Sequence, residues 1–206
     1  MPTRARRVRD AGGRPPTATE VARRRQILDA TISIVGRAGW AACTLQSVAD
    51  EIGVTKAAVI YHVGTKAGLV EQAYSFVIDD FVAFVQVRLE TAGTPLDAVV
   101  TFALAHLEHM REHRDHARLI AESLTDAAPA DIDDRPTSVS RTAPAVALID
   151  AARAAAADTG SREPAIVVAT VLNGMVDAAV AAWLQDPGFD LDAAGRLISV
   201  FIRTSV

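Results

Sequence analysis

Apolar residues recur at helical spacing along most of the chain, and no stretch shows the alternation of a β-strand. Residues that start and stop helices divide this pattern. Thr44, Thr55 and Thr65 stand where helix N-caps are expected, and Gly39 and Gly53 stand where helices should end. Abundant alanine favours helix as well. The sequence therefore predicts an all-α fold of about nine helices.

The expected helices divide the chain into three parts. Proline at position 95 suits a first helical residue, whereas residues 126–144 contain three prolines and four aspartates and predict a long loop. The helices are expected at residues 19–39, 44–52, 55–62, 65–90, 95–112, 115–125, 145–158, 163–185 and 190–206. We expect a flexible basic arm over 1–18, a helix-turn-helix domain over 19–66 and a helical body over 67–206.

The net charge of −4 hides an uneven distribution. Residues 1–25 hold eight arginines against Asp10 and Glu20, a net charge of +6, so the other 181 residues carry −10. A basic arm on an acidic body favours contact with a polyanion at one end. The alternative is a solvated tail without a partner.

Other features point to the cytoplasm. Cys43 is the only cysteine, which excludes an intrachain disulfide and a cysteine-based metal site. No apolar segment of a signal peptide follows the first basic residues. The apolar span 165–184 contains Thr170, Asn173 and Asp177, so we interpret it as a buried helix and not a membrane span.

Residues 44–62 have the pattern of two short helices joined by a tight turn. Gly53 can adopt the left-handed conformation that such a turn requires, and Ala49 is small where the helices would cross. The apolar contacts between the helices would come from Val48, Ile52, Val54 and Val59. Because such units also occur in proteins that never contact DNA, the pattern alone leaves DNA binding open.

The residues around the second short helix favour DNA. Small side chains at the tip of a helix allow it to enter the major groove, and Thr55, Lys56, Ala57 and Ala58 fit that tip. Phosphate contacts would come from Tyr61, His62 and from Lys66 at the start of the next helix. Lys56 and Lys66, the only lysines of the chain, would then flank one DNA strand. The alternative is a pair of ordinary surface lysines.

The segment TLQSVADEIGVTKAAVIYHVGTKAGLV at 44–70 resembles the DNA-binding signature of TetR-type transcriptional regulators. The matching features are the threonine cap, the Ala49–Gly53–Val54 turn, the Tyr61–His62 pair, and Lys66 followed by Leu69. The resemblance is specific over about residues 20–70. It implies a homodimer that binds double-stranded operator DNA and releases it when a small-molecule effector enters the C-terminal domain.

The resemblance also assigns DNA contacts by position. These are Thr44, Lys56, Tyr61, His62 and Lys66, and the full predicted set adds Thr55, Ala57, Ala58, Arg23 and Arg24. The sequence departs from the family at three places. Ile60 stands where a tyrosine often touches the backbone, Val63 replaces a usual phenylalanine, and Gly64 a more polar residue or proline. Ile60 removes a phosphate contact, for which the N-terminal arginines could compensate.

The span 163–185 carries three stripes of residues at helical spacing: one polar, one of small residues and one of bulky apolar residues. Small residues allow close helix approach, and resemblance places the dimer interface on the last two helices. The predicted interface comprises Val171, Gly174, Ala178, Ala182, Leu191, Ile198 and Phe201. The alternative is packing within the chain's own core. The polar stripe of Thr170, Asn173 and Asp177 could line a pocket or bond across the dimer.

Four of the five histidines lie at positions 106, 109, 113 and 116. This spacing could bind zinc or nickel if the helix were continuous, but no acidic or cysteine partner is evident in the sequence, so no metal and no cofactor is expected. His106 lies on an apolar segment and is expected in the core or in a pocket. The predicted ligand pocket comprises Phe102, His106, Met110, Asn173 and Asp177.

These features predict a cytoplasmic DNA-binding regulator, a repressor in most such families. A helical enzyme is disfavoured because the sequence has no G-x-S-x-G motif, no phosphate-binding glycine loop and no metal triad with carboxylates. A protein-interaction module with a degenerate helix-turn-helix is the other alternative. Salt-dependent binding to duplex DNA would distinguish the first function from the other two.

Overall fold

The computed structural model describes residues 17–124, 138–156 and 163–206. Within these ranges the chain forms nine helices and no strand, so the all-α prediction is confirmed. The helices are α1 (Ala18–Ala42), α2 (Leu45–Glu51), α3 (Lys56–Val63), α4 (Lys66–Leu89), α5 (Pro95–Glu112), α6 (Arg114–Ser123), α7 (Val139–Ala156), α8 (Ala165–Gln185) and α9 (Leu191–Ser205).

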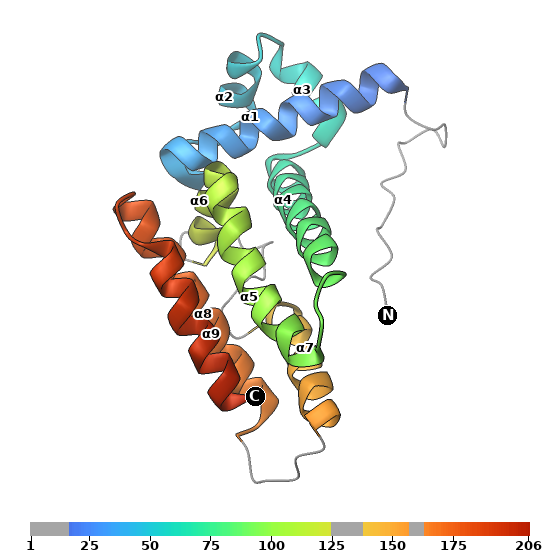
Figure 1. Cartoon of the computed structure of the whole chain (residues 1–206). Coiled ribbons are helices and arrows are strands. Elements are labelled where there is room, and N and C mark those ends of the chain that lie inside the picture. The colour runs from blue at the N-terminus through green and yellow to red at the C-terminus, as the bar shows by residue number, and fades with distance from the viewer. Residues whose placement is uncertain (1–16, 125–137, 157–162) are drawn as a thin grey trace.

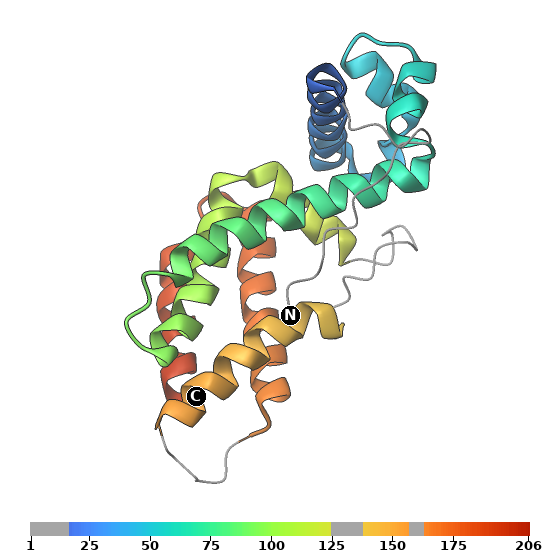
Figure 2. The same ribbon diagram turned by 90° about the vertical axis from the view of Figure 1, so that its right-hand side faces the viewer.

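The helices form a small N-terminal layer on a larger helical body (Figure 1). α1, α2 and α3 make one end of the molecule, and α4 runs from that end along the body (Figure 2). α1 packs on α6 and α4, whereas α5 lies at the centre of the body and contacts α4, α7, α8 and α9. The helix-turn-helix is therefore joined to the body through α4 and through the α1–α6 contact.

Side-chain caps explain where the helices begin. The hydroxyl oxygen of Thr44 accepts a hydrogen bond from the Ser47 N–H at 2.9 Å, and that of Thr65 from the Gly68 N–H at 3.0 Å. Asp190 caps α9 in the same way. At the other end, Gly39 breaks the helical conformation of α1 with a φ of 73°. These starts and this break follow the sequence prediction.

Two boundaries differ from the prediction. Thr17 caps α1 with Glu20 in a capping box, so the helix begins inside the segment assigned to the arm. α7 begins at Val139, so the end of the predicted loop is helical and Pro144 lies inside the helix. Buried residues of α7 pack on α5 and α8, and this packing outweighs the local penalty of an internal proline, roughly 3 kcal/mol. Residues 1–16 and most of the predicted loop lie outside the described part.

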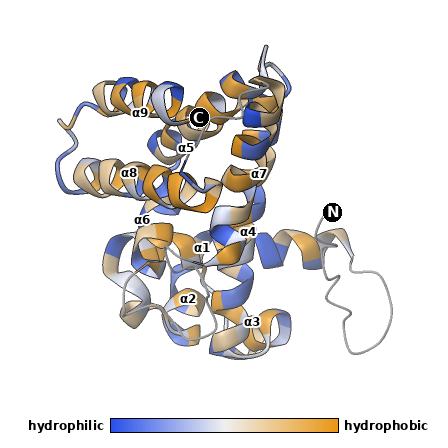
Figure 3. Cartoon of the chain, turned by 90° about the horizontal axis from the view of Figure 1, so that it is seen from below, coloured by the Kyte–Doolittle hydropathy of each residue, from blue (hydrophilic) through white to orange (hydrophobic). Residues whose placement is uncertain are grey.

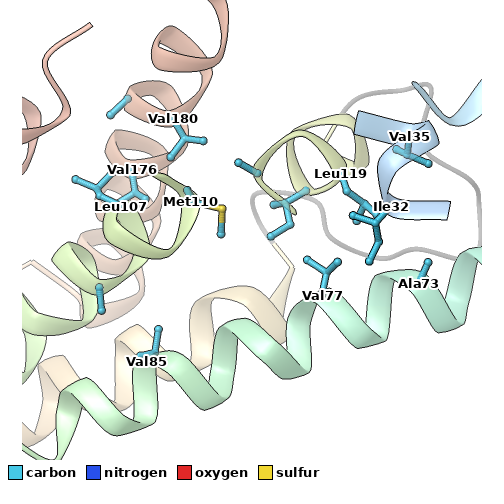
Figure 4. Close-up of a cluster of buried hydrophobic side chains, with 14 of the residues drawn as sticks. Ile32, Val35, Ala73, Val77, Val85, Leu107, Met110, Leu119, Val176 and Val180 are labelled. Atoms are coloured by element: carbon cyan, nitrogen blue, oxygen red, sulfur yellow. The ribbon is translucent and has the colours of Figure 1, made fainter. Parts of the chain in front are cut away.

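One hydrophobic core runs through both parts of the molecule. Ile32 and Val35 of α1 meet Ala73 and Val77 of α4 near Leu119 of α6 (Figure 4). Further along, Val85 of α4, Leu107 and Met110 of α5, and Val176 and Val180 of α8 continue the same cluster (Figure 4). The sequence predicts a domain boundary after residue 66, at the start of α4. Because the hydrophobic core continues across this position, no break in packing marks the boundary, and it remains a prediction.

α8 is a core helix with one open face. Of the helices described, it alone is long and apolar enough to cross a membrane, with a mean hydropathy of 1.9, and Figure 3 draws it mostly in apolar colours. Its bulky residues Val168 and Leu172 are buried against the neighbouring helices, with Met175 and Trp183 packed at the edge of the core. The sequence interpretation of a buried helix therefore holds for this face.

Candidate nucleic-acid interface

A compact apolar core fixes the angle between α2 and α3. Val48, Ala49 and Val59 are completely buried, and Val54 packs against them half-buried. The Val54 N–H donates to the Ala49 carbonyl at 3.0 Å, which closes the turn. Gly53 has a φ of 66°, the left-handed conformation that the sequence predicted for it. The two short helices are therefore held rigidly although neither would be stable alone.

α3 presents its outer face to solvent. Thr55, Lys56 and Ala57 at its N-terminus are exposed, and Thr55 caps the helix by accepting the Ala58 N–H at 3.2 Å. Tyr61 is the most exposed large hydrophobic residue of the helix, at 74%. A helix with small residues and a lysine at its tip can enter the major groove of B-DNA.

Tyr61 and His62 occupy different environments despite being neighbours. Their rings meet edge to face at 5.1 Å, and the Tyr61 hydroxyl donates to Glu20 of α1 at 3.4 Å. His62 is half-buried and lines a hollow of about 470 Å³ between α1, α3 and α4, together with Arg24 and Phe76. Tyr61 is thus the more accessible of the two to a phosphate group.

The arginines of α1 are engaged within the chain. Arg24 donates to the Gln72 side chain of α4 at 2.5 Å, and Arg23 donates to Gln26 at 2.9 Å. Arg24 therefore helps to fix α1 on α4, a role that its position in a run of three arginines did not reveal. A contact between Arg23 or Arg24 and DNA remains a prediction.

The junction between α3 and α4 depends on two glycines whose structural role was not predicted from the sequence. Gly64 ends α3 with a φ of 78°, which favours glycine over the polar residue usual there. A Cβ atom on Gly68 would lie 2.5 Å from the Val63 carbonyl oxygen, so only glycine permits this approach. The position of Gly68 inside a helical pattern could have indicated this close approach. Lys66 is exposed in the first turn of α4, between these two glycines.

Arg141 of α7 is the centre of a polar cluster that sequence reasoning missed. It forms an ion pair with Asp177, and its backbone carbonyl accepts from the Asn173 side chain at 3.3 Å. Asn173 and Asp177 therefore bond to α7, and their role in a ligand pocket remains a prediction. The sequence did not reveal this cluster, because Arg141 lies within the segment that was predicted to be a loop.

His106 lies beside this cluster. Burial lowers the pKa of its imidazole to about 3, and the positive charge of Arg141 contributes in the same direction. The ring is neutral at neutral pH and packs on Phe81 of α4, with ring centres 4.6 Å apart. Phe102 and Met110 are buried in the core. None of the five predicted pocket residues lines the large open hollow of about 1050 Å³ between α1, α4, α6 and α8.

The predicted dimer residues separate into an exposed and a buried group. Val171, Gly174 and Ala178 lie on an exposed face of α8, and a Cβ on Gly174 would meet nothing within 4 Å. Leu191 and Ile198, by contrast, are buried in the chain's own core, which corrects their assignment. Ala182 and Phe201 are half-buried. The face of α9 was misassigned because α9 packs on both α5 and α8.

The exposed apolar residues of α9 lie next in sequence to the predicted interface residues Ile198 and Phe201, on a neighbouring face of the helix. Leu197 is 67% exposed and Val200 61% exposed. On α8, Ile166 and Val167 join Val171 at the surface. α8 and α9 pack against each other, so their open faces are available together.

A rigid helix-turn-helix that exposes its second helix, carried at one end of a helical body, defines a DNA-binding protein of the helix-turn-helix class. The sequence pattern of bacterial regulatory proteins of the tetR family matches residues 27–73, which cover α2, α3 and the adjoining parts of α1 and α4. The resemblance to TetR-type regulators is thereby confirmed: this chain carries the family's DNA-binding region and has the fold of its transcriptional regulators.

Solved structures share the fold over nearly the whole chain. A putative TetR-family transcriptional regulator from Rhodococcus sp. is 20% identical, with a TM-score of 0.73 over 91% of this chain and 98% of that one. The regulator FadR from Bacillus subtilis, solved in complex with stearoyl-CoA, is 12% identical, with a TM-score of 0.76 over 88% and 98% of the two chains. The fatty acid degradation regulator FadR from Bacillus halodurans is 13% identical, with a TM-score of 0.75 over the same shares. No curated protein matches the sequence.

Proposed function

We propose that this protein is a cytoplasmic, homodimeric repressor that occupies an operator through α3 and leaves it when a small molecule binds the body. The observation that carries the proposal is the exposed outer face of α3 on a buried Val48–Ala49–Val59 core. A reading helix must be rigid and exposed at the same time, because base contacts require fixed geometry.

The proposed DNA contacts divide by chemistry. Lys56 and Ala57 face base edges from the tip of α3, and exposed Ile60, at 42%, can contact a thymine methyl group. Phosphate contacts come from Tyr61 and from Lys66, which stands in the first turn of α4 where free N–H groups favour an anion. Thr44, Thr55, Ala58 and His62 complete the set in supporting positions.

The proposed dimer forms through the exposed apolar faces of α8 and α9. Val171 and Gly174 of α8 lie on these faces, with Leu197 and Val200 of α9. Contiguous exposed apolar residues of this kind mark protein–protein interfaces. A two-fold axis through the patch would hold two copies of α3 for two half-sites, about one helical turn of DNA apart or a multiple of it.

We propose that the effector acts at the Arg141 cluster. Three of the predicted pocket residues, His106, Asn173 and Asp177, lie near or on Arg141 in the middle of the body. A polar ligand that competes for Arg141 would move α7 and α8 relative to α5. The complex of FadR from Bacillus subtilis with stearoyl-CoA supports only the general point that this fold can hold a small molecule.

The test begins with sequencing of genomic fragments that the purified protein retains, followed by anisotropy titrations of one recovered duplex at several salt concentrations. Lys66→Ala should weaken binding almost equally for all duplexes and lower the salt slope by about one unit. Arg111→Ala is the matched control, since it removes the same charge from an exposed residue of α5 that pairs with Asp192 at 3.1 Å. The control should keep the wild-type slope.

Two outcomes would count against these assignments. A loss confined to one base pair with an unchanged slope would contradict a phosphate contact by Lys66. Wild-type protein without salt-dependent duplex binding would contradict the proposed function and favour an interaction module or an enzyme.

A further inference from the structure

Three potential metal ligands converge where α4, α5 and α6 meet. Asp80 comes from the middle of α4, His109 from the last turn of α5 and His116 from the first turn of α6. The Asp80 Oδ2 atom lies 3.9 Å from His109 Nε2 and 3.6 Å from His116 Nδ1, and the three ligand atoms all lie within 4.8 Å of one another. No acidic partner for the histidines is evident in the sequence, and the fold provides one from α4.

Within the described part of the chain, the histidines of this cluster hold buried nitrogens without hydrogen-bond partners. His109 is completely buried, and among the described residues neither of its ring nitrogens has a hydrogen-bond partner. The same holds for Nδ1 of His116. A buried polar atom without a partner destabilises a fold by about 1–3 kcal/mol, so three such atoms at one point require a physical explanation.

Aromatic packing holds the rings in place. The His109 ring lies 5.5 Å from the Phe81 ring and 5.1 Å from the Phe84 ring, and Phe76 meets His116 edge-on at 6.4 Å. Asp80, by contrast, is 44% exposed and faces the solvent side of the cluster. Packed imidazoles with one exposed carboxylate at the entrance allow an ion to enter and then be held.

We propose that Asp80, His109 and His116 bind a divalent transition-metal ion of the Zn²⁺ type. Two ligands that are each about 2 Å from a tetrahedral ion lie roughly 3.3 Å apart, so the observed 3.6 and 3.9 Å require only a small contraction. Two imidazoles and one carboxylate suit zinc, cobalt or nickel, whereas magnesium and calcium prefer sites made of oxygen atoms.

Three protein ligands leave a fourth position for another group. His113 is exposed and stacks on His116 with ring centres 5.0 Å apart. It borders, with His116, an open hollow of about 360 Å³. The fourth position therefore faces solvent, where water or an exchangeable ligand can bind, and this arrangement is typical of sites that are not purely structural.

The ion would connect the helix that carries the DNA-binding end to the corner between α5 and α6. α6 packs on α1, and Arg118 of α6 donates to the Gly36 carbonyl of α1 at 2.6 Å. An ion that pulls Asp80 towards His116 therefore acts on both attachments of the helix-turn-helix, α4 and α6. This regulatory consequence rests on the proposed DNA-binding function, whereas the metal site does not.

Metal uptake is measured first, on untagged full-length protein without DNA. After removal of bound metal with EDTA, calorimetric titration with Zn²⁺ should give one tight site per chain, and Co²⁺ should give visible absorption bands. Asp80→Asn and His116→Gln should each weaken Zn²⁺ binding about tenfold or more. Asp79→Asn is the matched control, because it removes the same charge from the adjacent exposed residue of α4 and should leave binding unchanged. His116 is preferred to His109 because it is only half-buried.

Absence of saturable Zn²⁺ uptake, or equal weakening by Asp79→Asn and Asp80→Asn, would overturn the metal site. In the second measurement, one equivalent of Zn²⁺ should change the affinity of the wild type for its duplex about fivefold or more, and should not change that of Asp80→Asn. Normal uptake with unchanged DNA affinity would overturn the regulatory part alone. If the wild-type protein takes up Zn²⁺ normally but binds no duplex DNA with or without Zn²⁺, the proposed function is refuted and the metal site is not.

Discussion

Single residues set how closely the helices of the DNA-binding end approach one another. Gly68 is the clearest case, because the carbonyl oxygen of Val63 occupies the space that any side chain would need. Val48 and Val59 act in the opposite sense, since their side chains fill the space between α2 and α3. The position of α3 therefore depends on the lack of a side chain at Gly68 as well as on the packed side chains of Val48 and Val59.

Gly68→Ala should destabilise the fold by about 1–3 kcal/mol, because the new methyl group would lie 2.5 Å from a backbone oxygen that cannot move without shifting α3. Urea unfolding followed by circular dichroism measures this change. Gly93→Ala is the control, since the nearest atom to its Cβ is a flexible carboxylate oxygen at 3.8 Å. Equal stability of the two variants would show that α3 and α4 are not in close contact in solution.

His106 makes stability depend on pH. Its pKa is lowered to about 3 in the folded chain, against an ordinary 6.5 when unfolded, chiefly by burial and also by the charges of Arg141 and His109. Below about pH 6.5 the unfolded chain takes up a proton that the folded chain does not, so stability falls as pH falls towards 3.

His106→Gln should reduce this loss by up to about 1.4 kcal/mol per pH unit between about pH 6.5 and pH 4. The half-buried position of the ring makes this figure an upper bound. Unfolding would be followed in urea with EDTA present, so that metal binding does not contribute. A slope identical to that of the wild type would mean that the His106 ring is solvated in the native state.

At the scale of elements, α8 has a buried face and an exposed face. Val168 and Leu172 pack inward, whereas Val171 and Gly174 lie on an open face. Small residues on such a face allow another helix to approach closely. The open face is therefore expected to contact a second copy of the chain.

Gly174→Leu should shift the protein towards monomer in sedimentation and remove most of its specific DNA affinity. Overpacking costs about 1–3 kcal/mol per site, and a two-fold axis applies it twice. The folded monomer should tolerate the change, because a Cβ at Gly174 meets nothing within 4 Å, so far-UV circular dichroism should stay helical. Ala147→Leu, at an exposed position of α7, controls for an added surface leucine. A tight Gly174→Leu dimer with normal DNA binding would place the interface elsewhere.

For the whole molecule, charge is distributed unevenly along the chain. The helix-turn-helix lies at one end of the body (Figure 1), and the net charge of +6 on residues 1–25 belongs to that N-terminal part of the chain. Residues 26–66 hold three acidic and three basic residues, so the charge of −10 lies on residues 67–206, which DNA would repel. This distribution favours approach to DNA by the N-terminal end.

Removal of residues 1–16 deletes five arginines and Asp10, a net of +4, and leaves the Thr17 cap of α1 intact. Association with DNA should slow and affinity should fall, most strongly at low salt, because electrostatic steering is screened by salt. Stopped-flow anisotropy measures the association rate, and thermal unfolding should be unchanged. A clearly lower unfolding temperature would mean that these residues stabilise the fold.

Local signals in the sequence determined most of the helices and the helix-turn-helix. Thr44, Thr65, Pro95 and Asp190 act within one turn of their own positions, so the helix boundaries that they predicted agree with the structure. The Gly53 turn is local as well, because it depends on the conformation of one residue.

Only the tertiary structure decided what depends on distant residues. Pro144 lies in a helix because one face of α7 is buried against α5 and α8, and Ile198 is buried because α9 has two neighbours. Asp80 meets His109 and His116 from 29 and 36 residues earlier in the chain, across helices whose packing no local pattern encodes. Spacing along a helix determines which residues share a face. What that face meets is decided by the packing of the other helices, since apolar burial has no direction of its own.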